Sequence, residues 1–560
     1  MRSGLNRRSF LATAATVAGA AAMAPLLSAC GGGSTKKAGA NTREGLKAAL
    51  PSYVPNPNAV KPDIASVQGA ADIATDPAYL SYPASPPTTV SGVPGKGGSY
   101  TAVTPLWGTA PPVGNSFYQA MNKALGVELT MKPADGINYN TIVPTMTAAE
   151  KLPDWINLPA WWNANFNTGG LTGSQLADLT PYLSGDKIKK YPNLAALPTG
   201  AWQAGVWGDK LYGIPCFSTS FGMPGATFYR RDVLEARGIT ADQIRSADDL
   251  MNLGKELTDA KRGVWAFDDV WTYLQFTWNV PMGWRIDNGK LVHMFETQEF
   301  LEAVDWHYRL ANSGSMHPDT LAGDVANSGT RFYSGKCLIA GGGLGAWNLS
   351  DHQSGVAADP NYRRGALNSI TADGKGTPVA YMGASAGMLS YLNAKLKPAQ
   401  IEELLAVANF LAAPYGTAEY TLLTYGVEGV HHTRVSGVPT FTDEGKKDVQ
   451  PTTYAFLAAA PSVVSNPGGE QVTRDYSAWS AANVKYVTKA PFWGMNLSMP
   501  PAIATALAAP NVNDTLKDCY HGKKKVSDVQ DAVSSWRSGP GERLKQWMTD
   551  NVLDKYGTGQ

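Results

Sequence analysis

Beyond residue 97, short apolar runs alternate with stretches in which apolar residues recur every three or four positions. Two runs suited to strands, at 100–106 and 127–131, flank a stretch where Phe117, Met121 and Leu125 lie four residues apart, as on one face of a helix. Further strands are predicted at 154–158, 210–215 and 226–230, and further helices at 231–237, 301–310 and 401–411. Strand and helix in regular alternation predict an α/β fold.

The first thirty residues have a pattern of their own. Arg7 and Arg8 precede an uncharged run rich in Ala and Gly that ends in Leu-Ser-Ala-Cys at Cys30. Paired arginines before such a run are typical of twin-arginine export signals, and the tetrapeptide resembles a bacterial lipobox. The run is too weakly apolar for a permanent transmembrane helix. We expect residues 1–29 to be a cleaved signal peptide, and a lipid on Cys30 to hold the protein on the extracytoplasmic face of the cell membrane.

The next segment, residues 30–97, begins with a glycine run and contains many prolines. This composition predicts a lipid-anchored tether between the membrane and the folded body. A short part of it, such as residues 78–80, can instead lie on that body.

The composition limits the class of protein. With 560 residues, 44% of them hydrophobic, the chain can bury more than one large core. The formal net charge is +1 and falls below zero once the arginines of the signal are removed, so no basic surface for nucleic acid is expected. Of four cysteines, Cys30 is assigned to the lipid, and the remaining three allow at most one disulfide. Their spacing fits no metal site, and we expect neither a metal nor a cofactor.

Aromatic residues supply the first candidates for a binding site. The chain has 16 tryptophans and 24 tyrosines, and flat rings suit both cores and the faces of sugars. In α/β sheets, ligands bind beyond the carboxyl ends of the strands. The aromatic residues that follow predicted strands are Trp107, Trp161, Trp162, Phe217 and Tyr381.

Several segments, in order, resemble one family. They are Lys-Leu-Pro-Asp at 151–154, Leu-Ala-Asp-Leu-Thr-Pro-Tyr-Leu at 176–183, Lys-Leu-Tyr-Gly-Ile-Pro at 210–215, Phe-Tyr-Arg-Arg-Asp-Val-Leu at 228–234, Phe-Tyr-Ser-Gly-Lys-Cys-Leu-Ile at 332–339 and Tyr-Gly-Val-Glu-Gly-Val-His at 425–431. Together they resemble the extracellular solute-binding lipoproteins of ABC importers, of the sugar-binding type that includes maltose- and alginate-oligosaccharide-binding proteins. The resemblance covers roughly residues 98 to 550.

The resemblance implies a two-lobed α/β fold with a hinge and a ligand cleft between the lobes. The expected first lobe is 98–225 plus 377–425, and the expected second lobe is 228–375 plus 426–560. The implied function is that of a monomeric receptor, not an enzyme, which binds a solute, most simply an oligosaccharide, and delivers it to the permease subunits of an ABC transporter.

The resemblance also suggests site residues in the second lobe. Trp347 matches by position a ring that stacks on sugar in the maltose-binding relatives, although a tryptophan behind a glycine turn can equally be packed in a core. Trp271 and Tyr273 are candidates for the same lobe. The carboxylate of Glu428 could bond to sugar hydroxyls or hold the hinge segment, and we favour the structural role.

A secreted hydrolase is the main alternative. Gly-Ala-Ser-Ala-Gly at 383–387 matches the nucleophile elbow of esterases, with Ser385 as nucleophile and Asp475 and His521 following in the expected order. Ala340 stands where the oxyanion motif of such enzymes has histidine, which weakens this interpretation. A glycan-cleaving enzyme also stays open, because its two carboxylates cannot be recognised in a sequence.

Overall fold

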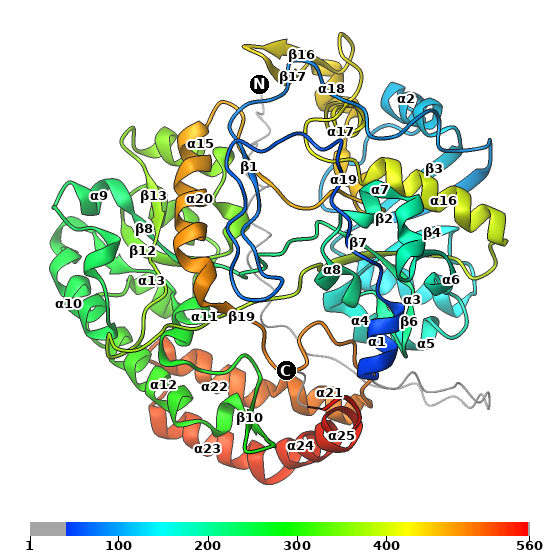
Figure 1. Ribbon diagram of the computed structural model, residues 1–560. Coiled ribbons are helices and arrows are strands. Elements are labelled where there is room, and N and C mark those ends of the chain that lie inside the picture. Colours follow the sequence, from blue (N-terminus) through cyan, green and yellow to red (C-terminus); the bar gives the residue numbers. More distant parts are fainter. Residues whose placement is uncertain (1–40, 558–560) are drawn as a thin grey trace, which may run out of the picture.

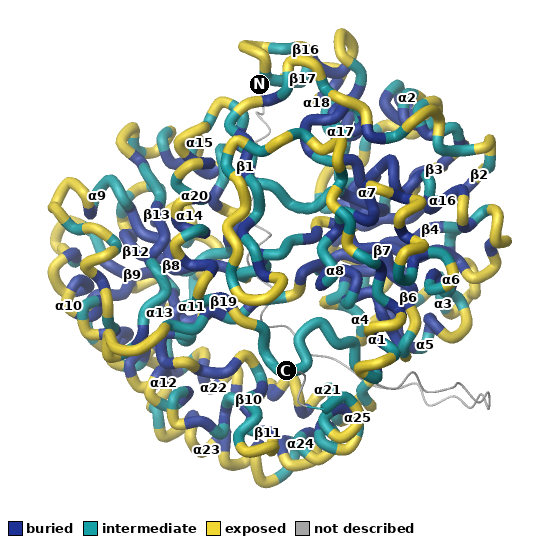
Figure 2. Tube along the Cα trace, viewed as in Figure 1, coloured by how far each residue is buried: buried dark blue, intermediate teal, exposed yellow. Residues whose placement is uncertain are grey.

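The computed structural model describes residues 41–557, which form two lobes side by side (Figure 1). The two-lobed α/β fold is thereby confirmed. Each lobe has a buried sheet at its centre and exposed helices and loops at its periphery (Figure 2). The predicted export signal with Arg7 and Arg8 and the predicted lipidation site at Cys30 lie outside the described residues.

The first lobe is built on a five-stranded sheet in the order β3-β2-β4-β15-β7. Its strands are β2 (Ser99–Leu106), β3 (Glu128–Asp135), β4 (Trp155–Pro159), β7 (Gly213–Cys216) and β15 (Met388–Leu392). The first three are parallel, whereas β15 runs antiparallel to both β4 and β7. The strands predicted from the apolar runs before residue 216 therefore all lie in this lobe, and a strand from much later in the chain completes their sheet.

Helices cover the first sheet with the apolar faces that the periodicity predicted. In α2 (Ser116–Leu125), Phe117, Met121 and Leu125 are fully buried, and the side chain of Asn115 caps the helix by accepting a hydrogen bond from the amide of Tyr118. The long helix α16 (Pro398–Leu411) contributes to the same core.

The second lobe contains a four-stranded sheet in the order β13-β8-β12-β9. Its strands are β8 (Ala226–Arg230), β9 (Trp265–Phe267), β12 (Cys337–Gly342) and β13 (Arg364–Ala366). Helices α10 (Ala247–Leu257), α12 (Gln298–Ala311), α22 (Pro510–Tyr520) and α23 (Val526–Trp536) contribute to its core. Cys216 is buried in the first lobe and Cys337 and Cys519 in the second, and all three are free thiols.

The chain returns to the second lobe later than we expected. Residues from 426 onward were predicted to belong to that lobe, but Val449, Tyr454 and Leu457 lie in the core of the first. The helix α19 (Pro451–Ala455) packs next to α17 (Ala418–Tyr425), so this stretch continues the first lobe. The crossing follows, before α20 (Glu470–Asn483), which packs on the second lobe.

The segment predicted as a tether is packed against the body from residue 41 onward, and this part of the prediction was wrong. Leu46 and Ala49 of α1 (Arg43–Ala49) enter the first core. Farther along, β1 (Ala78–Tyr79) pairs with β18 (Val464–Ser465) where the chain crosses between the lobes. We call residues 41–97 the N-terminal strap.

The N-terminal strap is held by specific polar contacts as well as by its apolar residues. The amides of Thr89 and Val90 both donate to Oε1 of Glu419, at 2.8 Å each. The carboxylate of Asp72 lies 2.6 Å from Nζ of Lys489. These contacts explain why a proline-rich composition did not produce a flexible linker: its backbone groups and charges have partners on the folded body.

Asp76 of the strap is expected to make folding stability depend on pH. Its Oδ1 accepts a hydrogen bond of 2.8 Å from the hydroxyl of Thr219, and burial raises its pKa from 3.8 to about 7. Between these two values the folded state binds more protons than the unfolded state, so the contribution of Asp76 to the free energy of unfolding falls as pH rises through this window. Asp76→Asn changes the free energy of unfolding, and this change should be more favourable at pH 8 than at pH 4 by on the order of 2 kcal/mol.

Urea unfolding at both pH values measures this difference. Asp514→Asn, at an exposed position on α22, is the control for replacing an exposed carboxyl. An equal effect of Asp76→Asn at pH 4 and pH 8 would show that the carboxyl titrates normally.

Candidate ligand-binding site

Three tryptophans meet at the carboxyl ends of the first sheet. Trp107 follows β2, while Trp161 and Trp162 follow β4 in the short helix η2 (Ala160–Trp162). The centroid of the Trp107 ring lies 6.3 Å from that of Trp161 and 6.3 Å from that of Trp162, and the last two are 5.8 Å apart. Because β2 and β4 are parallel neighbours, residues that follow them necessarily emerge close together.

Two phenylalanines extend this group. Phe217 follows β7, with a backbone φ of 52° that is unusual for an aromatic residue. Its ring centroid lies 5.6 Å from that of Phe456, which in turn lies 6.1 Å from that of Trp107. We call these five aromatic residues, Trp107, Trp161, Trp162, Phe217 and Phe456, the ring cluster.

The sequence analysis missed Phe456, which follows a helix rather than a strand. Two long-range contacts place it: Nδ2 of Asn157 in β4 donates to its carbonyl at 2.6 Å, and Oγ of Ser390 in β15 donates to the carbonyl of the next residue, Leu457. No local pattern in the sequence around residue 456 indicates either contact.

Two members of the ring cluster face solvent to an unusual degree. Trp161 is 45% exposed and Phe217 is 43% exposed. Phe456 is only 9% exposed, and its ring packs against that of Phe217. An exposed group of large aromatic side chains at the end of a sheet is typical of a binding surface rather than of a core.

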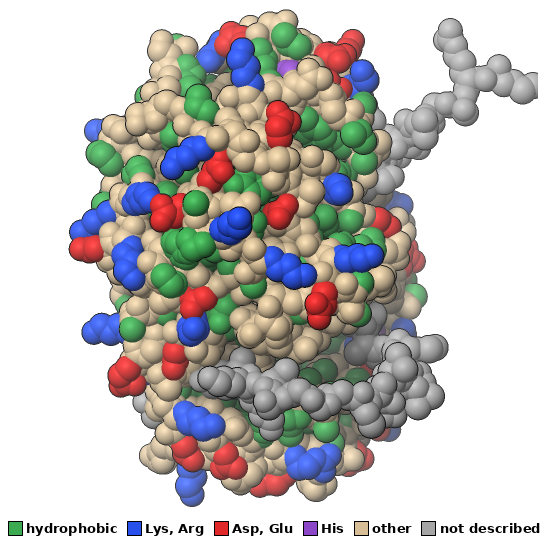
Figure 3. Space-filling model, turned by 90° about the vertical axis from the view of Figure 1, so that its right-hand side faces the viewer, with side chains coloured by type: hydrophobic (Ala, Val, Ile, Leu, Met, Phe, Trp, Pro, Cys, Tyr) green, Lys and Arg blue, Asp and Glu red, His purple; other side chains and the backbone are tan. Residues whose placement is uncertain are grey.

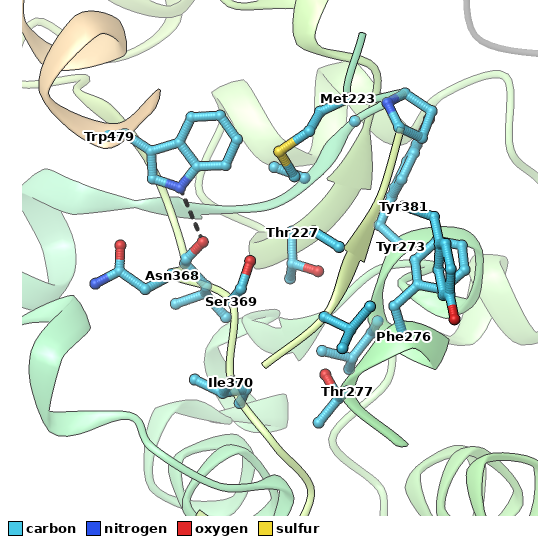
Figure 4. Close-up of a pocket in the computed structure, with 17 residues that line it drawn as sticks. Met223, Thr227, Tyr273, Phe276, Thr277, Asn368, Ser369, Ile370, Tyr381 and Trp479 are labelled. Carbon is cyan, nitrogen blue, oxygen red and sulfur yellow. Dashed lines mark hydrogen bonds between the residues drawn. The ribbon is translucent and has the colours of Figure 1, made fainter. Parts of the chain in front are cut away.

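The second lobe contributes a pocket next to the hinge, with an empty volume of about 610 Å³ that is partly open to solvent (Figure 4). Tyr273 comes from α11 (Trp271–Leu274) and Phe276 from η6 (Gln275–Trp278), both of which follow β9. Tyr381 comes from the crossing segment, in β14 (Ala380–Tyr381), and its ring lies 5.7 Å from that of Phe276. The rest of the lining is Met223–Thr227, Leu274, Thr277, Leu367–Ile370, Val379, Ala380 and Trp479.

The polar groups of the pocket are hydroxyls and the side-chain amide of Asn368, which already donates to Asp242 and accepts from Asn483. Thr227, Thr277, Ser369 and Asn368 lie around the pocket, and the indole N–H of Trp479 is already bonded to the carbonyl of Leu367, 3.0 Å away (Figure 4). Burial raises the pKa values of Tyr273 and Tyr381, so both phenols stay protonated at neutral pH. Such groups both donate and accept hydrogen bonds, as sugar hydroxyls require.

Two predicted ligand residues are enclosed in the core of the second lobe. Trp271 is 7% exposed and stacks on Tyr520, with ring centroids 5.4 Å apart and planes 8° apart. Trp347 is 6% exposed and packs against Phe228 and Trp479. Their burial favours a packing role for both over contact with a ligand.

Glu428 lies apart from the ring cluster and the pocket. Its side chain is 57% exposed, and its Oε2 is 3.5 Å from Nε of Arg434 in the hairpin that follows. That guanidinium also donates to the carbonyl of Pro83 in the N-terminal strap. The arrangement favours the structural role that we expected for Glu428.

The residues of the hydrolase alternative have separate partners. Ser385 is 3% exposed on the crossing segment. Asp475 accepts hydrogen bonds from Arg231 and Arg363, and His521 lies 3.6 Å from Asp269. The geometry therefore gives no support to a Ser385-Asp475-His521 triad. Within residues 41–557 there is also no cluster of side chains suited to a metal ion, and no helix of the length and apolarity that a membrane span requires.

Comparison with known families identifies the fold. Residues 107–414, more than half of the chain, match the family described as "bacterial extracellular solute-binding protein". The protein belongs to this family. The members of this family are described by their binding of a solute and not by a reaction that they catalyse.

Several relatives resemble this solute-binding protein over most of its length. The polygalacturonan/rhamnogalacturonan-binding protein YtcQ of Bacillus subtilis (strain 168) is 24% identical over 398 residues, which are 65% of this chain and 74% of YtcQ. The N-glycan transport solute-binding protein NgtS of Streptococcus pneumoniae is 15% identical, with a TM-score of 0.59 over 83% of this chain and 100% of that one. The alginate-binding protein AlgQ2 is 14% identical, with a TM-score of 0.54 over 81% and 98%. The two structures agree in fold with this chain.

A glycine explains how the Trp107 ring fits, and it offers a test of the ring cluster. A Cβ on Gly136, which follows β3, would lie 2.6 Å from the indole of Trp107. Gly136→Ala should therefore displace that ring, change the near-ultraviolet circular dichroism and destabilise the fold by about 1–3 kcal/mol. Gly345→Ala is the matched control, since nothing lies within 4 Å of the added Cβ. An unchanged aromatic spectrum for Gly136→Ala would contradict the described position of Trp107.

Proposed function

We propose that this protein is the extracytoplasmic receptor of an ABC importer and that it captures an oligosaccharide between its lobes. The observation that carries the proposal is the exposed ring cluster at the carboxyl ends of the first sheet. Sugars present patches of C–H groups that pack on aromatic faces, while their hydroxyls need polar partners. The names of YtcQ, NgtS and AlgQ2 state saccharide ligands, which supports the same class here.

The ring cluster and the pocket have complementary roles in this proposal. Trp161 and Phe217 would stack on the apolar faces of sugar units, at about 0.5–1.5 kcal/mol each. On the other lobe, sugar hydroxyls would form hydrogen bonds with Thr227, Ser369 and the phenol of Tyr273. Three or four stacking contacts together with several hydrogen bonds can reach the roughly 8 kcal/mol of micromolar affinity.

Transport would depend on conformation rather than on chemistry. A ligand that touches both lobes binds the closed form better, and its differential affinity sets how far the population shifts toward that form. We propose one lobe of 98–216 plus 388–458 and a second of 226–367 plus 470–557, with the crossing segments between them as the hinge. The permease would recognise the closed arrangement of the lobes.

We further propose that the protein is a monomer anchored by a lipid on Cys30 after export through the twin-arginine route. The motifs that support this lie in residues 1–40, and the family is extracellular. Cells fed a labelled fatty acid should label the wild-type protein and not Cys30→Ser, which should appear in the soluble fraction. Labelling of Cys30→Ser would contradict the assignment of the anchor.

A thermal-shift screen of residues 31–560 against a glycan panel tests the function directly. A ligand that binds only the folded state raises the melting temperature in a dose-dependent manner. We expect a shift with one glycan class, and mass spectrometry should recover that glycan intact. Cleaved products would support the glycan-cleaving alternative, and no shift with any glycan would contradict the proposal.

Single substitutions in the ring cluster should then weaken the binding of that glycan without unfolding the protein. Because Trp161 and Phe217 are both largely exposed, replacing either by Ala should cost about tenfold in affinity by isothermal titration calorimetry, with little change in melting temperature. Tyr53→Ala is the matched control, an aromatic side chain that is 56% exposed in the N-terminal strap. Equal affinities for all three variants would exclude the ring cluster as the site.

A further inference from the structure

We propose that the oligosaccharide is neutral and that this protein discriminates against chains of uronic acids. The inference rests on the proposed function and specifies its substrate class. Its basis is the charge of the groups that surround the candidate site.

In the described part of the chain, no charged side chain lines the pocket of the second lobe. The five residues of the ring cluster are tryptophan and phenylalanine, and the polar residues of the pocket are threonine, serine, asparagine and tyrosine. Carboxylates are recognised in proteins by Arg and Lys, most often through paired hydrogen bonds to a guanidinium. The lining of the pocket and the five rings themselves include none of these partners, whereas the pocket offers sugar hydroxyls both donors and acceptors.

The cation that acts on the pocket is already neutralised. Burial raises the pKa of the Tyr381 phenol, and the positive charge of Arg285, in β10 (Trp284–Asp287), acts in the opposite direction. Its Nε donates to Asp287 at 2.9 Å and its Nη1 donates to Glu299 at 2.7 Å. Two carboxylates on one guanidinium leave this group with a net negative charge, which would repel an anionic ligand.

A second cation near the hinge is also occupied. Nζ of Lys489 lies 2.6 Å from Asp72 of the N-terminal strap and 4.2 Å from the centroid of the Trp493 ring. In the second lobe, Asp269 follows β9, and its carbonyl accepts a hydrogen bond from the amide of Gly341. Its carboxylate adds another negative charge at the carboxyl ends of the second sheet.

Neither the face in Figure 3 nor the net charge of the chain provides attraction for a polyanion. On the face in Figure 3, Lys and Arg side chains alternate with Asp and Glu, without a continuous basic patch. The full chain has a formal net charge of only +1, and three of its arginines lie in the predicted signal. Long-range steering of an acidic polysaccharide would need a basic surface.

Discrimination follows from the cost of burying an unpaired charge. A carboxylate that leaves water for an uncharged site loses its hydration without gaining a partner, and this penalty is larger than that of a hydrogen-bonded hydroxyl. The names of the relatives do not decide the matter, because those of YtcQ and AlgQ2 state polygalacturonan/rhamnogalacturonan and alginate, whereas that of NgtS states an N-glycan.

Matched pairs of ligands test the inference. Isothermal titration with gluco-, galacto- and manno-oligosaccharides, each beside the uronate of the same linkage and length, should give at least about a hundredfold weaker binding for every uronate. Binding of a neutral chain should also be independent of salt concentration. Uronate binding equal to or tighter than neutral binding would overturn this inference and leave the oligosaccharide receptor intact. Binding of neither class would instead contradict the proposed function itself.

A variant tests the cause. Ser369→Lys places a cation in the pocket and should strengthen uronate binding at least tenfold, whereas the matched control Ser538→Lys, at an exposed position, should not. If Ser369→Lys folds with the wild-type melting temperature and uronate binding does not improve, the missing cation is not the reason for the selectivity. If the variant does not fold, the ligand pairs alone decide.

Discussion

The site depends on the insertion of β15 between β4 and β7. This strand belongs to a segment that returns after the chain has built most of the second lobe, and its register pairs Leu389 with Leu158 on one side and Ser390 with Ile214 on the other. The buried Oγ of Ser390 accepts a hydrogen bond of 2.8 Å from Nε1 of Trp155 and donates to the carbonyl of Leu457. One hydroxyl thus joins three distant parts of the chain, and two of them, β4 and the segment at Leu457, lead into the ring cluster.

The same insertion connects the two halves of the candidate site. The amide of Ala160, directly before Trp161, donates to the carbonyl of Gly387 at 2.9 Å. The crossing segment that ends at Gly387 also carries Tyr381, which lines the pocket of the second lobe. The N-terminal strap reinforces this region from outside, since Asp76 bonds to Thr219 on the first crossing. The hinge is therefore an assembly of several chain segments, and its geometry is fixed by hydrogen bonds between residues far apart in sequence.

This dependence on long-range contacts explains what the sequence could predict. The apolar runs predicted the strands. The three tryptophans chosen because they follow strands, Trp107, Trp161 and Trp162, lie together in the structure, while their contact with a ligand stays a prediction. Phe456 could not be found, because its position is set by Asn157, which lies 299 residues away in the sequence. Trp347 follows a strand and yet is covered by α20, whose packing no local pattern reveals. The strap was misjudged for the same reason, since composition does not show that Glu419 binds its backbone.

A crystal structure of the protein with the glycan recovered from the screen tests the central claim most directly. The account predicts sugar units stacked on Trp161 and Phe217, hydroxyls bonded to the pocket that contains Tyr273 and Tyr381, and lobes closer together than in the free protein. A glycan bound elsewhere, for example against Trp347 and Asp475 on the second lobe alone, with the ring cluster still in water, would contradict it.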